Sequence, residues 1–439
     1  MSRHGEPFGE PFGGPVVLDD AELILGMWRH LATYAVAPST AALGDLVFAG
    51  KVYEMAWRLR GSGLSSGARV RAIGIDARIP ARELEQMVLP TLESLNWIKV
   101  NRGADGKLVS VEAVIPPPSE LIAAAPRILD VCGIDALQRA VLEMLRATTL
   151  QPLERNAALE VASSHGDEIA EAALRHLVVL HLVNEVEAAD GRSAVFNPNI
   201  WASDATITEA ALKVEDAHVR AEVGALIEEL ITAPGLPEIE VKSTSQQWID
   251  FAVSQGLIQR SVVQTSENDE KRFLFAPHLG RDPFGVQPGD VSGHVRQLVG
   301  SMVYAATFAR YKLTRPDQFV SALIRDGEAG DASPIGTDYP MLETGGIVRV
   351  VQGSTPEKFR FQLLQADVAE GALKILQSRE SGGISRVARG SGDLRSQRTY
   401  THVESERARV ALIAPPDDET TRILTAALRQ SIASRGVHG

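Results

Sequence analysis

Short stretches of this 439-residue chain carry side chains that enzymes use, but each lacks the rest of its motif. The run GSGLSSGAR, residues 61–69, offers glycine amides that can cradle a phosphate, yet no Gly-Lys-Ser/Thr ending follows, and the next segment has the pattern of a strand. The run SSHGD, residues 163–167, holds serine, histidine and aspartate, but neighbours in sequence do not have the geometry of a catalytic triad. A nucleotide site is therefore not expected at the first run, and a loop or helix-cap role is expected for the second.

Metal and thiol chemistry find equally little support in the residue types. His176 and His181 are five positions apart, which places them about 140° apart around a helix, and no carboxylate motif or cysteine pair accompanies them. Cys132 lies among apolar residues in ILDVCGID, where an inert buried thiol is expected. We therefore predict a non-enzymatic protein with no metal site and no cofactor.

One pattern recurs four times and indicates the elements that position everything else. A helical stretch ends in a polar turn, a bulky apolar pair begins a strand, and a charged turn leads into a second strand, as in GLIQRSVVQTSENDEKRFLFAP at residues 256–277. The strands open at Trp97, Leu182, Leu257 and Ile347, at spacings of 85, 75 and 90 residues. Such a period predicts a repeated unit of small-domain size.

Apolar residues at helical spacing precede each hairpin and leave room for two or three helices per unit. In the first unit we expect a helix over 42–60, a short strand in RVRAIGI at 69–75, and helices over 81–96 that Pro90 divides.

The order of helices followed by a two-stranded hairpin resembles the winged helix-turn-helix family, by pattern and without a diagnostic signature. The predicted fold class is mainly α with small β-hairpins, an α+β chain with a tandem array of about four winged-helix-like domains. The predicted boundaries are a flexible Gly/Pro leader at 1–16, units at 17–120, 121–202, 203–285 and 286–378, and an Arg/Gly/Ser-rich arm with a C-terminal helix at 379–439.

The resemblance implies that the third helix of a unit enters the major groove of DNA while the hairpin, or wing, lies along phosphates. Acidic residues outnumber basic ones in the third helices of the first, second and fourth units, which disfavours a groove lined with phosphates. The third unit differs, because KSTSQQWIDFAVSQG has one acid, Asp250, and presents glutamines that can pair with adenine. We assign Ser245, Gln246 and Gln247 to base edges, with Trp248, Phe251 and Ala252 as the buried stripe and Ser254 towards solvent.

Phosphate contacts are predicted in the first wing, at Arg102 and Lys107, and in the basic segment after the fourth unit. That segment, SRESGGISRVARGSGDLRSQR, is too poor in apolar residues to form a core, and such arms often make salt-sensitive contacts with nucleic acid. Its predicted phosphate ligands are Arg386, Arg389, Arg395 and Arg398. A solvated linker is the alternative role. Beyond it, residues 417–436 have the apolar stripe of a terminal helix.

The whole chain has a net charge of −12, which argues against coating nucleic acid with its entire surface but allows a local basic site. A single cysteine, no secretory signal and no long apolar run predict a cytoplasmic protein with no membrane contact, of bacterial style. The predicted function is DNA binding by a transcriptional regulator or DNA-associated factor, with duplex DNA as partner. The alternative is a protein-interaction scaffold whose acidic winged-helix faces, or C-terminal helix, dock a partner protein or a second copy.

Overall fold

The computed structural model describes residues 20–34, 38–150, 152–187, 193–197, 217–254, 256–276, 293–381 and 396–413. It is a mixed α+β structure, mostly helical, with small antiparallel sheets of three or four strands, so the predicted fold class is confirmed at this level. The leader at 1–16, Arg386, Arg389, Arg395 and the terminal helix expected at 417–436 lie outside the described residues.

The first unit contains the hairpin expected after Trp97 and the helices expected over 42–60 and 81–96, but the strand predicted at 69–75 is wrong. The segment RVRAIGI is helical: α4 begins after Ser66, whose side chain accepts a hydrogen bond from the Arg69 amide at 3.3 Å. A π-helical turn at Leu84–Val88 ends two residues before Pro90 and changes to α-helix at Leu89, close to the expected division. The elements over residues 20–132, which include the first residues of the predicted second unit, are α1 (Asp20–Leu31), α2 (Pro38–Ala41), α3 (Gly44–Leu59), β1 (Leu64–Ser66), α4 (Gly67–Asp76), α5 (Ala81–Glu83), α6 (Leu89–Ser94), β2 (Ile98–Arg102), β3 (Leu108–Ala113), α7 (Pro118–Ala123) and α8 (Ala125–Cys132).

The second unit shares one apolar core with the first, which extends from Ala21 to Val195. Its sheet has the order β4-β6-β5, and the first sheet has the corresponding order β1-β3-β2. The elements are α9 (Ala136–Leu150), β4 (Leu153–Glu154), α10 (Arg155–Val161), α11 (Asp167–Val179), β5 (Asn184–Glu187) and β6 (Ser193–Phe196).

The third unit contains the predicted hairpin at 256–277, but this hairpin is an internal sheet and not an exposed ribbon. Phe273 and Phe275 on β9 pack into the core that includes α16, whereas Leu274 between them packs against α14 and α15. A strand from the C-terminal region, β13, pairs with β8, so the sheet order is β13-β8-β9-β7. The elements are α14 (Ala217–Thr232), β7 (Leu236–Pro237), a 3-10 turn (Glu238–Glu240), α15 (Gln246–Ser254), β8 (Gln259–Thr265), β9 (Glu270–Phe275) and β13 (Gln397–Thr401).

The fourth unit again places its last strand in the middle of a sheet, in the order β10-β12-β11. The long helices α16 and α19 pack on each other beside this sheet. The elements are α16 (His294–Thr307), α17 (Pro316–Asp326), β10 (Glu328–Ala332), α18 (Pro340–Thr344), β11 (Val348–Gln352), β12 (Phe359–Leu363) and α19 (Ala366–Ser381). The chain then returns to the centre through β13 and α20 (Val403–Ile413).

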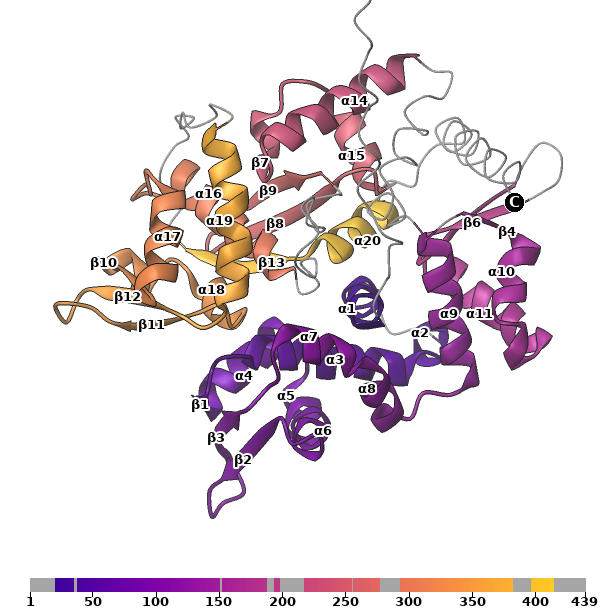
Figure 1. The fold of residues 1–439 in the computed structure, drawn as a ribbon, viewed down its shortest axis with the longest axis horizontal. Coiled ribbons are helices and arrows are strands. Elements are labelled where there is room, and N and C mark those ends of the chain that lie inside the picture. The colour runs from indigo at the N-terminus through magenta and orange to yellow at the C-terminus, as the bar shows by residue number, and fades with distance from the viewer. Residues whose placement is uncertain are drawn as a thin grey trace, which may run out of the picture.

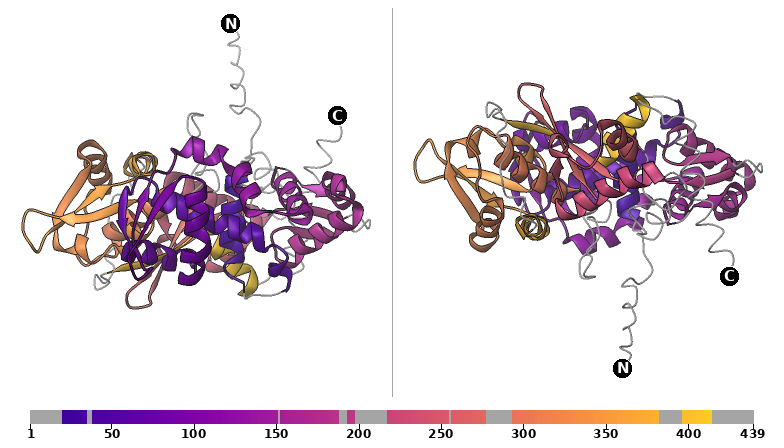
Figure 2. Two further views of the ribbon diagram at one scale, coloured as in Figure 1. Left: turned by 90° about the horizontal axis from the view of Figure 1, so that it is seen from below. Right: turned by 90° about the horizontal axis from the view of Figure 1, so that it is seen from above.

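The four units surround a pair of helices from the two ends of the described chain. Figure 1 shows α1 and α20 side by side at the centre, and the two helices are in contact. Nine of the twelve residues of α1 are buried, as expected for a helix covered on all sides. The second and fourth units lie at opposite ends of the long axis (Figure 2).

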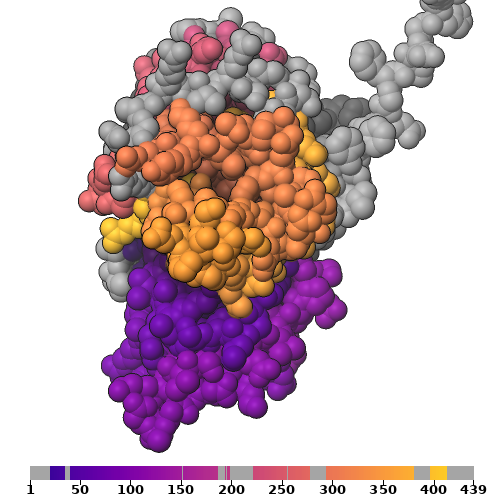
Figure 3. All heavy atoms as spheres, turned by 90° about the vertical axis from the view of Figure 1, so that its left-hand side faces the viewer, coloured from indigo at the N-terminus to yellow at the C-terminus, as the bar shows by residue number. Residues whose placement is uncertain are grey.

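The first and fourth units are held together by a polar contact between residues that are remote in sequence. Arg60 binds both carboxylate oxygens of Asp367, at 2.8 and 2.9 Å, and Gln365 donates to the carbonyl oxygens of Trp57 and Gly346 at 2.9 and 3.0 Å. Figure 3 shows the orange fourth unit lying directly against the indigo first unit. The contact is close enough that Gly346 has no room for a side chain, because a Cβ would lie 1.8 Å from the carbonyl oxygen of Arg58.

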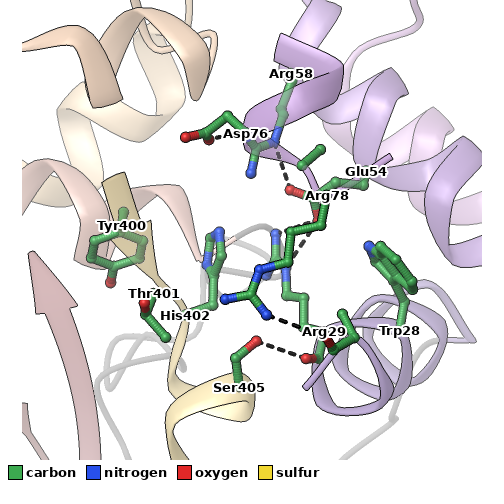
Figure 4. A pocket seen from close by; sticks show the side chains of 12 residues that line it. Trp28, Arg29, Glu54, Arg58, Asp76, Arg78, Tyr400, Thr401, His402 and Ser405 are labelled. Atoms are coloured by element: carbon green, nitrogen blue, oxygen red, sulfur yellow. Dashed lines mark hydrogen bonds and ion pairs between the residues drawn. The ribbon is translucent and has the colours of Figure 1, made fainter. Parts of the chain in front are cut away.

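A buried chain of alternating charges lies next to this contact. Glu54, which is 2% exposed, receives hydrogen bonds from Arg29 at 3.0 Å and from Arg58 at 2.7 Å, and Arg58 also donates to Asp76 at 2.5 Å (Figure 4). Burial alone would raise the pKa of Glu54, but Arg29 and Arg58 outweigh it and hold the pKa at about 2. These residues tie α1, α3 and α4 together.

Substitution of Gly346 by alanine tests the contact between the first and fourth units. Both Gly346 (φ 73°) and Gly106 (φ 76°) have left-handed backbone, but nothing lies within 4 Å of a Cβ at Gly106. G106A therefore reports the conformational cost alone, about 1 kcal/mol. We expect G346A to lower the free energy of unfolding by at least about 2 kcal/mol more than G106A, measured by urea unfolding. Equal losses in the two variants would contradict the contact.

Substitution of Glu54 by glutamine tests the buried charge chain. Since two guanidinium groups lose their shared carboxylate, E54Q should lower the free energy of unfolding at neutral pH by about 3–5 kcal/mol. The pKa of Glu54 is lowered from 4.5 to about 2, so its stabilisation is present above pH 4.5 and is lost as pH falls towards 2. The difference between wild type and E54Q should therefore shrink over that range. The exposed Glu112 supplies a control, E112Q, expected to change stability by less than about 0.5 kcal/mol.

Candidate nucleic-acid interface

The beginning of α15 presents the three residues that the sequence assigns to base edges. Ser245, Gln246 and Gln247 are exposed, and the Ser245 carbonyl oxygen accepts hydrogen bonds from the amides of Trp248 and Ile249 at 3.1 and 3.2 Å. These bonds form the first turn of the helix and fix the direction of the side chains around it. The three residues are thus accessible to a partner, and their contact with DNA remains a prediction.

The buried face of α15 differs in part from the expected stripe. Ile249, Ala252 and Val253 are buried, while Trp248 and Phe251 are half-buried and meet edge to face with centroids 5.8 Å apart. Ser254, expected towards solvent, is 7% exposed and donates to the Phe251 carbonyl oxygen at 2.8 Å. The helix is rotated from the predicted orientation because α20 also packs against it, which the local sequence does not reveal.

An ion-pair network below α15 holds its first turn in place. Glu238 accepts hydrogen bonds from Gln246 at 3.0 Å, from Arg260 at 3.0 Å and from Arg272 at 3.1 Å. Arg260, which is 2% exposed, also binds Asp250 and Glu406 at 2.6 and 2.9 Å. Arg260 is therefore shared by three carboxylates, and Arg272 adds a second cation at Glu238.

The first wing offers less free positive charge than its sequence indicates. Arg102 donates to the Glu85 carbonyl oxygen at 3.0 Å and forms an ion pair with the Glu85 carboxylate at 3.6 Å. Lys107 is paired with Asp105 at 2.9 Å, and both side chains are exposed. Lys107 thus has a carboxylate of its own, whereas Arg102 shares Glu85 with Arg71, which binds this carboxylate at 2.7 Å. Phosphate would have to compete with both carboxylates.

The Arg-rich segment connects two folded elements. Arg379 is in the last turn of α19, which ends at Ser381, and Arg398 is exposed on β13, at the register irregularity between Gln397 and Thr399. The Ser396 carbonyl oxygen accepts a hydrogen bond from the Ser266 amide at 3.1 Å. Residues 382–395 are therefore joined to the folded structure at both ends, whereas a free arm is joined at one.

A cluster of basic residues near the beginning of α15 was not predicted. Lys242, Lys312 and Arg379, here called the basic cluster, come from three separate segments and lie close enough to Glu240 to act on its ionisation. Burial raises the pKa of Glu240, and Arg379, Lys242 and Lys312 offset part of this shift. Tyr311, next to Lys312, is 64% exposed, with the Arg310 guanidinium 5.7 Å from its ring centroid.

Lys242 connects the basic cluster to the start of α15. Lys242 is three residues before Ser245, and Arg379 is three residues before the Arg-rich residues 382–395. Exposed aromatic and cationic side chains of this kind contact bases and phosphates in nucleic-acid complexes. The sequence contains the signal only as scattered lysines and arginines, because folding alone brings 242, 312 and 379 together.

The residues considered for catalysis or metal binding lie in ordinary structural settings. Burial raises the pKa of the Cys132 thiol to about 12, with the Asp45 carboxylate adding to the shift, so the thiol is protonated at neutral pH. His165 pairs with Glu143 at 3.1 Å, and the Ser163 hydroxyl donates to the Glu160 carbonyl oxygen at 2.8 Å. Within the described ranges, no three His, Cys, Asp or Glu side chains come together as a metal site requires.

No protein-family model, no curated protein and no solved structure matches this chain. Across the part of the chain that the structure describes, no helix has the length and apolar character needed to span a bilayer. What the chain does must therefore be inferred from its own residues and geometry.

Proposed function

We propose that this chain is a non-enzymatic DNA-binding protein, a transcriptional regulator or DNA-associated factor built from four winged-helix-like units. The recurrent sheet order supports the winged-helix part of the proposal, because in three sheets a short first strand pairs with the last strand of the following hairpin. In the remaining sheet, that of the third unit, β7 likewise pairs with β9.

The observation that carries the DNA proposal is the basic cluster around Glu240, whose Lys242 comes three residues before the exposed first turn of α15. Gln246 and Gln247 have the donor and acceptor groups that adenine edges require, and Lys242 and Lys312 supply charge for the adjoining phosphates. Arg386, Arg389 and Arg395 follow Arg379 in sequence and would extend the basic surface. Sequence selection and backbone attraction thus have separate residues.

The third hairpin has no wing role in this proposal. Both of its faces are covered by helices, and its turn exposes Glu267, Asp269 and Glu270, which repel phosphate. The loop at 308–315 and the Arg-rich segment take over the backbone contacts. This arrangement departs from the usual winged-helix docking geometry, in which helix and wing of one unit bind together.

A second candidate function is a protein-interaction scaffold. The pairing of Arg102 with Glu85 and of Lys107 with Asp105 favours it, since phosphate would have to compete with these carboxylates at the first wing. The acidic third helices of three units favour it as well. Measurement of DNA binding separates the two candidates.

The full-length chain should bind duplex DNA with an affinity whose logarithm falls linearly with the logarithm of salt concentration, measured by fluorescence anisotropy. The double variant K242Q/K312Q should bind more weakly and with a shallower slope, by about 0.9 for each phosphate that the variant no longer neutralises. The exposed Lys99, far from α15 on β2, supplies the matched control K99Q, which should leave both values unchanged.

The triple variant R386Q/R389Q/R395Q tests the Arg-rich segment in the intact fold. Removing the Arg-rich segment by truncating the chain after residue 378 would not test it, because the truncation would also remove β13 and α20 from the centre of the structure. No binding to DNA at low salt would contradict the DNA proposal and leave the scaffold. Wild-type slopes in K242Q/K312Q would contradict the assignment of the surface.

A further inference from the structure

A polar cavity of about 40 Å³ lies between helices α1, α3 and α4 on one side and β13 with the start of α20 on the other. Arg58, Asp76, Arg78, Thr401, His402 and Ser405 are among its lining residues, and Figure 4 shows them converging from these elements. A water molecule needs about 10–15 Å³ by this measure, so the space suits a phosphate-sized ion and is far too small for a nucleotide.

The two carboxylates of the cavity are already neutralised by two arginines. Glu54 is bound by Arg29 and Arg58, and Asp76 is bound by Arg58 at 2.5 Å. These four side chains sum to zero charge. Any further cation in the lining therefore gives the cavity a positive charge.

Arg78 is that further cation. Its guanidinium donates to the Ala32 carbonyl oxygen at 3.3 Å and has no carboxylate partner among the residues that the structure describes. Its backbone is left-handed, with φ 57°, because Arg78 closes the C-terminal turn of α4, in which the Ile79 amide donates to the Gly74 carbonyl oxygen at 2.9 Å. In Figure 4 its side chain extends among the other lining residues.

His402 supplies an unsatisfied polar atom in the same cavity. It is 7% exposed, and its Nε2 has no hydrogen-bond partner in the described part of the chain. Burial and the charges of Arg29 and Arg58 lower the pKa of His402 well below its ordinary value, so the ring is neutral and has one N–H to donate. A buried polar atom without a partner destabilises the fold, and in the tautomer with the proton on Nε2 an oxygen atom of a bound anion would satisfy it.

We propose that this cavity binds a small inorganic oxyanion of phosphate size, with Arg78 supplying the charge and His402 a hydrogen bond. Surplus positive charge, an unpartnered buried ring nitrogen and a fitting volume all indicate this class of ligand. A bound oxyanion would contact residues on both sides of the cavity, so it would stabilise the docking of β13 and α20 on the first unit. The site is separate from the basic cluster and does not depend on DNA binding.

Isothermal titration of the full-length chain with inorganic phosphate tests the proposal, with ionic strength held constant by potassium chloride. We expect saturable binding at one site per chain and a rise in the midpoint of thermal unfolding that saturates over the same concentrations. R78Q should lose at least about tenfold in affinity. R82Q removes an exposed arginine that bonds Gln86 at 3.0 Å and does not line the cavity, so it should bind phosphate as wild type does.

The variant R78G separates lost binding from damaged folding. Because glycine adopts φ 57° without strain, R78G should unfold at the wild-type temperature or higher without phosphate, yet show no response to phosphate. Wild-type affinity in R78Q and R78G, or no saturable binding by the wild-type chain, would overturn the proposal. Displacement of phosphate by chloride at equal concentration would also overturn it, since the site would then be a halide site.

Discussion

The placement of the Glu54 carboxylate between two guanidinium groups is the constraint on which the arrangement of the molecule depends. The side chain is buried at the meeting point of α1 and α3, and it remains ionised only because Arg29 and Arg58 are close to it. Arg58 in turn binds Asp76 on α4, and the carbonyl oxygen of Arg58 lies where Gly346 of the fourth unit approaches. One ion network thus orients the central helix and the contact that brings the first and fourth units together.

The arrangement of the units also depends on β13 and α20, through which the chain returns to the centre of the molecule. β13 completes the third sheet, and α20 contacts α1, α15 and β8. Glu406 of α20 is fully buried and binds Arg260 of the third sheet. The residues that hold α15 in position therefore belong to the end of the described chain, which connects the candidate DNA surface to the central helices.

Features that depend on local pattern could be predicted from the sequence. Alternating apolar residues between polar turns correctly indicated the hairpins that begin near Trp97 and Leu257. The short strands β4 and β7 have two residues each, too few to show a period, and RVRAIGI contains apolar residues that fit a strand as well as a helix.

Features that depend on contacts between distant segments could not be predicted. The exposure of Gln246 and Gln247 follows from local polarity, whereas the gathering of Lys242, Lys312 and Arg379 is a result of folding. The pairing of Arg102 with Glu85 likewise joins a hairpin to a preceding helix. The buried charges of Glu54 and Arg58 give no sequence signal either, because charged residues on a helix are usually solvated.

The chain has a net charge of −12 and one local group of cations. We therefore propose that most of its surface repels DNA and that the region around the start of α15 attracts it. Hydrogen–deuterium exchange with and without duplex DNA at low salt measures where contact occurs. The account predicts slower exchange in peptides covering 242–248 and 308–315, with no change at the first hairpin, 98–113. Protection at the first hairpin alone, or no protection anywhere, would contradict it.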